Sequence, residues 1–301
     1  MTLADSGIDY LVYKPSLVGC CSLKLTKPPI KGSVQPSPIF FLVLAITVGG
    51  FIALYVEQVP IRIAAFVFGT GIWILSLIFH EFGHAIVAWR SGDLSVAPKG
   101  YLTLNPLKYA HPVTSILIPV GVLLFGGIGL PGGAVYIDRS KMDEIDGAKF
   151  SAAGPLANLT VAGLLLIPFI VGVVPGSTAI VDRTSLTIAP ILAFSAAIQI
   201  LAALLNSIPI PPLDGFGMIE PILPGQIRLA ARRFGSLGFI LLIVIFLQPD
   251  ISRQIFLPVD WIFGLFDIDN TLVDEGLRCF RFWSEAEAMC DSGRNIEFGS
   301  A

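Results

Sequence analysis

Charged residues are scarce in this 301-residue chain, because Asp, Glu, Lys and Arg make up only 14% of it, against about 25% in soluble globular proteins. The formal net charge is −3, so the basic excess typical of nucleic-acid binding is absent and we expect no nucleic-acid partner. The four cysteines show no C-x-x-C spacing, and neither a disulfide framework nor a cysteine-based metal site is expected. They are Cys20, Cys21, Cys279 and Cys290.

Apolar residues are abundant in the chain. They make up 54% of the chain, and the mean hydropathy is +0.80. Six runs contain no Asp, Glu, Lys, Arg or His: residues 39–56, 63–79, 113–135, 151–181, 184–213 and 234–249. A helix needs roughly 20 apolar residues to cross a bilayer core. The pattern therefore predicts an all-α, polytopic membrane protein with five full spans, and residues 113–130 as a sixth, partial crossing.

More polar ends flank this membrane core, which we place at residues 39–249. Residues 1–38 hold several lysines and prolines and no continuous apolar stretch, which indicates a soluble arm rather than a cleaved signal peptide. Residues 250–301 form a C-terminal tail. Its polar part, residues 268–301, predicts an amphipathic or frayed segment, and we favour a solvated end without chemistry.

Two of the three histidines lie at the end of an apolar run, in the sequence His-Glu-Phe-Gly-His at residues 80–84. On a helix, His80 and His84 share a face and suit two ligands of one Zn²⁺, with Glu81 in reach of a water on the metal. The alternative is a pair of buried histidines bonded to backbone. Three ionisable groups within five residues at membrane depth disfavour that alternative, because such groups are costly there without a partner.

A catalytic zinc ion usually has three protein ligands and one open position. Asp214 is the candidate third ligand, because it follows three prolines, at positions 209, 211 and 212, that cannot continue a helix. The preceding span must therefore unwind, and irregular backbone at membrane depth is tolerated only inside protein or beside a cavity. Asp214 could instead cap a helix over residues 215–223, but the histidine pair favours the ligand role.

These segments resemble the site-2 protease family of intramembrane zinc metalloproteases, in its prokaryotic form without a PDZ-like domain. Residues 104–112 and 151–158 are also similar to segments of prokaryotic members, so the resemblance covers about residues 70–225. It implies that His80, His84 and Asp214 bind one zinc ion per subunit. It further implies that Glu81 is the catalytic base and that Asn206 assists at the scissile carbonyl.

Three polar side chains keep alternative roles. Asn206 could be a helix-end cap before the prolines. Asn158 could hydrogen-bond the metal site or only satisfy backbone between close-packed helices. His111 stands where many relatives have Asp, and we interpret it as a hydrogen-bonded interface residue rather than a fourth ligand.

For one ion to reach all three ligands, the ends of their spans must lie on the same side of the membrane. Residues 113–130 would then descend as a helix and return as extended, β-like chain through residues 131–137. The edge of residues 132–137 could pair with an unwound substrate by β-addition, or could only fill the mouth of the cavity.

Lysine and arginine concentrate on that shared side, in residues 1–38, 90–112, 136–150 and 209–234, whereas the opposite short loops hold little beyond Arg62 and Arg183. By the positive-inside rule the shared side is cytoplasmic. We therefore expect an integral, multi-pass protein of a prokaryotic cell membrane with its active site toward the cytoplasm.

The resulting hypothesis is a zinc endopeptidase that hydrolyses peptide bonds in transmembrane segments of other proteins, with the lipid bilayer and those substrates as partners. One alternative is a non-catalytic membrane scaffold with a zinc site. The other is a metal transporter, which would show paired inverted repeats or more polar residues along its spans; the sequence shows neither.

Overall fold

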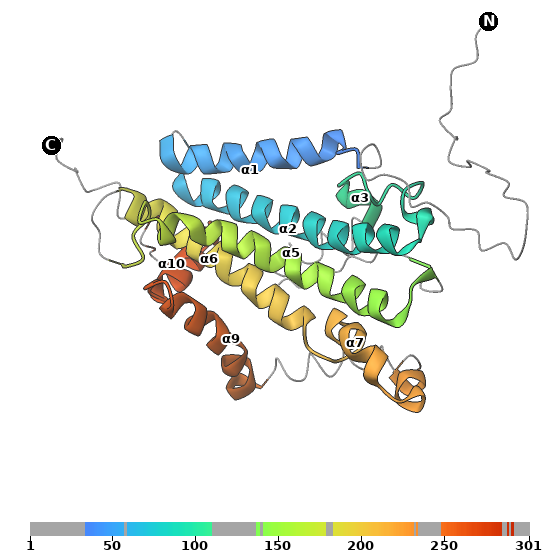
Figure 1. The fold of residues 1–301 in the computed structure, drawn as a ribbon. Helices are drawn as coiled ribbons and strands as arrows, with labels where there is room; N and C mark the ends of the chain where they lie inside the picture. Colours follow the sequence, from blue (N-terminus) through green and yellow to red (C-terminus); the bar gives the residue numbers. More distant parts are fainter. Residues whose placement is uncertain are drawn as a thin grey trace, which may run out of the picture.

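The structure is a computed structural model that describes residues 34–56, 59–109, 137–138, 141–178, 183–231, 233, 248–284, 288, 290 and 291. Figure 1 shows four long helices running side by side. They are α1 (Pro38–Val56), α2 (Ile61–Ser91), α5 (Glu144–Ile170) and α6 (Arg183–Asn206). Helix α2 packs between α1 and α5, and α5 also packs on α6. No strand occurs among the described residues, which agrees with the all-α prediction.

These four helices are long and apolar enough to cross a membrane, and the chain is a membrane protein. They correspond to the predicted runs at residues 39–56, 63–79, 151–181 and 184–213. Helix α1 leaves Leu42, Ile52 and Tyr55 exposed, as expected for a helix that faces lipid. Residues 113–136 and 234–247 lie outside the described part of the chain. The partial crossing, the extended return and the last predicted span therefore stay predictions.

The segment after α2 folds back onto the end of that helix. It contains η1 (Leu94–Val96) and α3 (Pro106–Tyr109), both packed on α2. The Asp93 carboxylate accepts hydrogen bonds from the backbone N–H groups of Ser95 (3.0 Å) and Asp138 (2.8 Å). Burial opposes the ionisation of Asp93, but these bonds outweigh it and hold the carboxyl pKa below its usual range. Asp93 thus joins the end of α2 to the segment that precedes α5.

Helix α6 ends at Asn206, and the proline-rich turn that follows leads into α7 (Asp214–Ile219) and η4 (Glu220–Ile222). The predicted unwinding at the prolines is therefore confirmed. The turn is tight, because a β-carbon at Gly215 would overlap the carbonyl oxygen of Ser207. It brings α7 against α5. Helix α7 begins at Asp214 itself, with Leu213 as its N-cap residue, so Asp214 does not stand at the capping position that the alternative required.

The described part of the C-terminal region is folded. Helices α9 (Pro249–Gly264) and α10 (Thr271–Phe280) pack against α6, and Figure 1 shows α10 and α7 near opposite ends of α6. Helix α10 buries Leu272, Cys279 and Phe280, which lie seven and eight residues apart on one helical stripe. The amphipathic alternative therefore holds for residues 271–280, and the solvated end that we favoured is wrong there.

A disulfide joins Cys279 to Cys290, so the expectation that no disulfide forms is also wrong. The turn after α10 brings the two cysteines together. The spacing of two cysteines in a sequence does not by itself predict such a pair. Arg62, at the start of α2, forms an ion pair with Asp291 and donates to the carbonyl of Ser284 at 2.6 Å. The disulfide therefore lies at the end of the bundle where α2 begins.

Candidate metal centre

Three predicted ligands meet beside the C-terminal third of α2. The Nε2 atoms of His80 and His84 lie 3.2 Å apart. Oδ2 of Asp214 lies 3.3 Å from Nε2 of His80 and 3.2 Å from Nε2 of His84. Zinc bonds of about 2.0–2.1 Å in a tetrahedron place neighbouring ligand atoms about 3.3–3.4 Å apart. The nearly equilateral triangle thus matches one face of a tetrahedral zinc site and leaves the fourth corner for water or substrate.

The opposite nitrogens of the two imidazoles are held by hydrogen bonds. Nδ1 of His84 lies 2.7 Å from the carbonyl oxygen of Phe150, and Nδ1 of His80 lies 2.6 Å from Oδ1 of Asn158. A carbonyl oxygen only accepts, so each Nδ1 carries the proton and each Nε2 presents a lone pair to the triangle. Two nitrogen lone pairs and a carboxylate oxygen converge there, and such a set of electron donors binds a cation. The donor set fits Zn²⁺.

Helix α5 supplies both of these acceptors from one face. Phe150, Gly154 and Asn158 are spaced four residues apart and therefore lie above one another along the helix. A β-carbon at Gly154 would overlap the imidazoles of His80 and His84. Only glycine lets α5 come this close, and that approach brings the Phe150 carbonyl and the Asn158 amide within reach of the two histidines. Asn158 therefore hydrogen-bonds a histidine of the candidate metal centre, which was one of its two predicted roles. The other role, in which it only satisfies backbone groups between helices, does not account for this bond.

Glu81 is buried, with 3% of its surface exposed, and follows His80 directly on α2. Burial is the main cause that raises the pKa of the Tyr109 hydroxyl, in α3. Tyr109 donates its hydroxyl hydrogen to the carbonyl of Tyr101 at 3.1 Å. The role of Glu81 as the base stays a prediction.

Asn206 lies at the last residue of α6, and its Nδ2 donates to the carbonyl of Ala202 in the preceding turn at 3.0 Å. One of its two amide hydrogens is therefore used within the helix. Its catalytic role stays a prediction. His111 lies outside the described residues.

Sequence reasoning missed two residues behind the metal centre. Nδ2 of Asn158 donates to Oγ of Ser76 at 2.8 Å and to Oε1 of Gln199 at 3.0 Å. Oγ of Ser76 in turn donates to the same Gln199 oxygen. The signals were present in the sequence: Ser76 stands one turn before His80, and Gln199 is an amide within an apolar run, two turns before Asn206.

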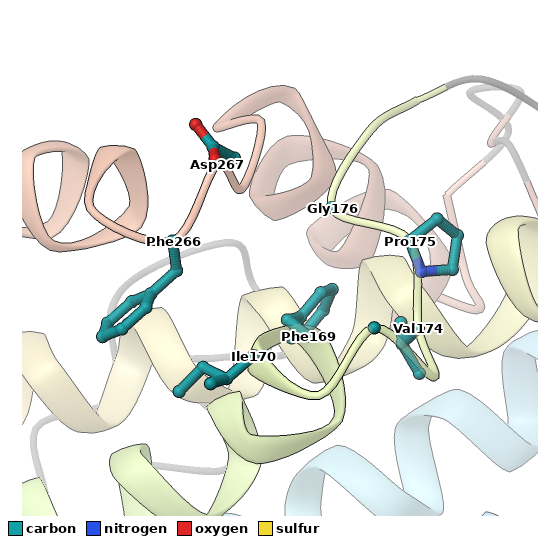
Figure 2. A pocket seen from close by; sticks show the side chains of 8 residues that line it. Phe169, Ile170, Val174, Pro175, Gly176, Phe266 and Asp267 are labelled. Atoms are coloured by element: carbon teal, nitrogen blue, oxygen red, sulfur yellow. The ribbon is translucent and has the colours of Figure 1, made fainter.

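A hollow of about 440 Å³ lies elsewhere, between the end of α5 and the link from α9 to α10. Figure 2 shows Phe169 and Ile170 on one side of it and Phe266 and Asp267 on the other. This hollow is at the C-terminal end of α5, whereas the metal centre contacts Phe150, in the second turn of α5, and Asn158, near its middle. It is therefore separate from the metal centre.

Comparison with known proteins places the chain among bacterial relatives. It is 40% identical over 261 residues to the "Putative zinc metalloprotease Rip2" of Mycolicibacterium smegmatis, a match that covers 85% of this chain and 97% of that protein. The Rip2 protein of Mycobacterium tuberculosis is 39% identical over 256 residues, which cover 84% of this chain and 96% of that protein.

A more distant relative is the "Putative zinc metalloprotease YwhC" of Bacillus subtilis, 33% identical over 180 residues, or 58% of this chain and 78% of that protein. No family model and no solved structure matches the chain. The extent of the Rip2 match, together with the His80, His84 and Asp214 triangle, shows that the chain belongs to the site-2 protease family of zinc metalloproteases.

Proposed function

We propose that the chain is an intramembrane zinc endopeptidase that hydrolyses peptide bonds in transmembrane segments of other proteins. The observation that carries the proposal is the triangle of two histidine nitrogens and one carboxylate oxygen, enclosed by helices long and apolar enough to span a bilayer. The names of the Rip2 and YwhC relatives support the peptidase class. The enclosing apolar helices support a substrate that lies in the membrane.

The position of the triangle along α2 suits this reaction. His84 stands seven residues before the end of α2 at Ser91, which is about 10 Å of helix rise. At that depth a peptide bond lies inside the membrane segment of a substrate. Water from the nearer membrane surface has to travel a distance of only two helical turns to reach it. Substrate helices with Gly, Pro or Asn near this depth should unwind most easily, because such residues weaken a helix.

The chemistry divides between the metal and the chain. When bound, Zn²⁺ supplies a Lewis acid that lowers the pKa of a coordinated water and polarises a carbonyl. Glu81 accepts a proton from the attacking water and returns it to the leaving nitrogen, so that OH adds to the carbonyl carbon and H to the nitrogen as the C–N bond breaks. The Asn206 hydrogen that is not bonded to Ala202 donates to the developing oxyanion.

We further propose that the protein crosses the prokaryotic cell membrane several times with the metal centre toward the cytoplasm. Disulfides persist in oxidising compartments and are rare in the cytoplasm. The Cys279–Cys290 disulfide lies at the end of the bundle remote from the histidines. The positive-inside distribution of Lys and Arg independently favours the same orientation.

The test is cleavage by purified protein in liposomes that also hold a candidate single-span substrate. Mass spectrometry should find new fragment ends inside the apolar segment. Glu81→Gln should retain zinc and lose about 10²–10⁴-fold of the rate. The matched control is Glu144→Gln, because Glu144 is exposed at the start of α5 and pairs with Arg228 at 2.9 Å. Fragment ends only outside the membrane segment, or full activity of Glu81→Gln, would contradict the proposal.

A further inference from the structure

The two histidines of the metal centre are oriented by different kinds of acceptor. His84 bonds to a backbone carbonyl, that of Phe150, which can only accept. His80 bonds to the side-chain amide of Asn158, and an amide can turn over to present either its oxygen or its NH₂ group. The tautomer of His84 is therefore fixed by the backbone, whereas the tautomer of His80 depends on which way the Asn158 amide is turned.

The orientation of the Asn158 amide decides which nitrogen of His80 carries the hydrogen. With Oδ1 of Asn158 toward His80, Nδ1 of the imidazole donates and Nε2 offers its lone pair to the triangle. With the NH₂ group there instead, Nδ1 must accept and the proton moves to Nε2. A protonated Nε2 cannot ligate a metal. The orientation of one buried amide thus decides whether His80 is a ligand.

Ser76 alone cannot fix this orientation, because a hydroxyl both donates and accepts. The Oε1 atom of Gln199 removes that freedom. It accepts from Oγ of Ser76, which leaves the serine as an acceptor toward Asn158, and it also accepts directly from Nδ2 of Asn158. A reversed Asn158 amide would place its oxygen against the Gln199 oxygen. With its oxygen facing these two donors, Gln199 therefore selects one orientation of Asn158.

We propose that Gln199 is a positioning residue that, through Asn158, keeps the Nε2 atom of His80 available to the metal. This inference rests on the proposed metal centre. The three residues come from three different helices, α2, α5 and α6, and each has less than 5% of its surface exposed: Ser76 1%, Asn158 4% and Gln199 2%. A half-satisfied polar cluster would cost stability in such surroundings. The complete set of hydrogen bonds orients His80 and also connects the three helices to one another.

The experiment measures zinc affinity of the purified full chain by competition with a chelator, without substrate. Gln199→Met keeps an unbranched side chain of similar length but has no acceptor oxygen, and it should raise the zinc Kd about 10–100-fold. Ser195→Ala is the matched control. Ser195 stands one turn before Gln199, is buried, and its hydroxyl has no partner within the described residues. This control should leave the zinc Kd unchanged.

The same Gln199 substitution in an Asn158→Asp variant separates the effect on amide orientation from the effect on packing. In Asn158→Asp, both side-chain atoms facing His80 are oxygens, so either orientation accepts from Nδ1. Adding Gln199→Met to Asn158→Asp should therefore change the zinc Kd less than about threefold, against 10–100-fold in the Asn158 background. An unchanged Kd for Gln199→Met alone would overturn the inference, and so would an equal loss in both backgrounds. Because no substrate is used, absence of peptidase activity counts against the proposed function only.

Discussion

Gly154 of α5 lies so close to His84 of α2 that a β-carbon at position 154 would overlap Nε2 of the imidazole. The same β-carbon would meet the ring of His80. One missing side chain thus lets α5 approach both imidazoles, and the arrangement of the candidate metal centre rests on this contact.

Gly154→Ala should therefore impair zinc binding. Relief of the overlap must push α5 or the imidazoles apart, and such overpacking typically costs about 1–3 kcal/mol, or roughly 5–150-fold in zinc affinity. Metal content after dialysis and the zinc Kd measure the effect. Gly163→Ala is the control, since position 163 lies on the same helix and a β-carbon there meets nothing within 4 Å. Equal zinc affinity in the two variants would show that α5 is not so closely packed.

Asp93 should stabilise the fold in a pH-dependent way. Its carboxylate accepts two backbone hydrogen bonds, and its pKa in the folded protein is lowered. A lowered folded pKa means that the stabilisation is complete above the unfolded value of about 4 and is lost as the pH falls through the folded pKa. Asp93→Ala should cost about 1–2 kcal/mol at pH 7, and the difference from wild type should shrink below about pH 4. Thermal unfolding in detergent at both pH values measures this, and a difference that grows on acidification would contradict it.

The disulfide should stabilise the C-terminal region. It closes a loop of 11 residues, for which the chain-entropy estimate is about 2–3 kcal/mol. Replacing Cys279 and Cys290 by serine should lower the thermal stability of the packing between α10 and α6. Hydrogen exchange of α10 amides measures this loss locally. Unchanged protection in the double-serine variant would mean that Phe280 and Leu272 hold α10 without the bond.

Cysteine labelling reports the orientation in the membrane. A membrane-impermeant maleimide added to intact cells should not label Cys279 or Cys290, because both are buried and joined in the disulfide, so any labelling reports the other two cysteines. Cys20 and Cys21, in the arm that we expect to be cytoplasmic, should stay unlabelled in intact cells and react only after lysis. Labelling of Cys20 or Cys21 before lysis would reverse the proposed orientation.

Much of the metal centre could be predicted because its signals are local. The spacing of His80 and His84 places them on one helical face, and three prolines mark where α6 must end before Asp214. The apolar runs likewise predict α1, α2, α5 and α6 from length alone.

The remainder depends on packing between distant segments. Gln199 meets Asn158 only because α5 and α6 pack in one particular rotation and register, which hydrophobic runs without a polar face do not specify. Cys279 meets Cys290 only after a turn whose residues carry no strong turn signal. Gly154 could be predicted to favour close packing of helices, but not which side chains it would approach.

The most direct test of the account is the zinc content of the purified chain, with X-ray absorption to define the ligands. The wild type should hold one zinc ion per chain, bound by two histidine nitrogens and oxygen ligands at about 2.0–2.1 Å, and Asp214→Ala should lose it during dialysis that the wild type withstands. Wild-type protein without metal, or Asp214→Ala that binds zinc as tightly as the wild type, would contradict the central claim.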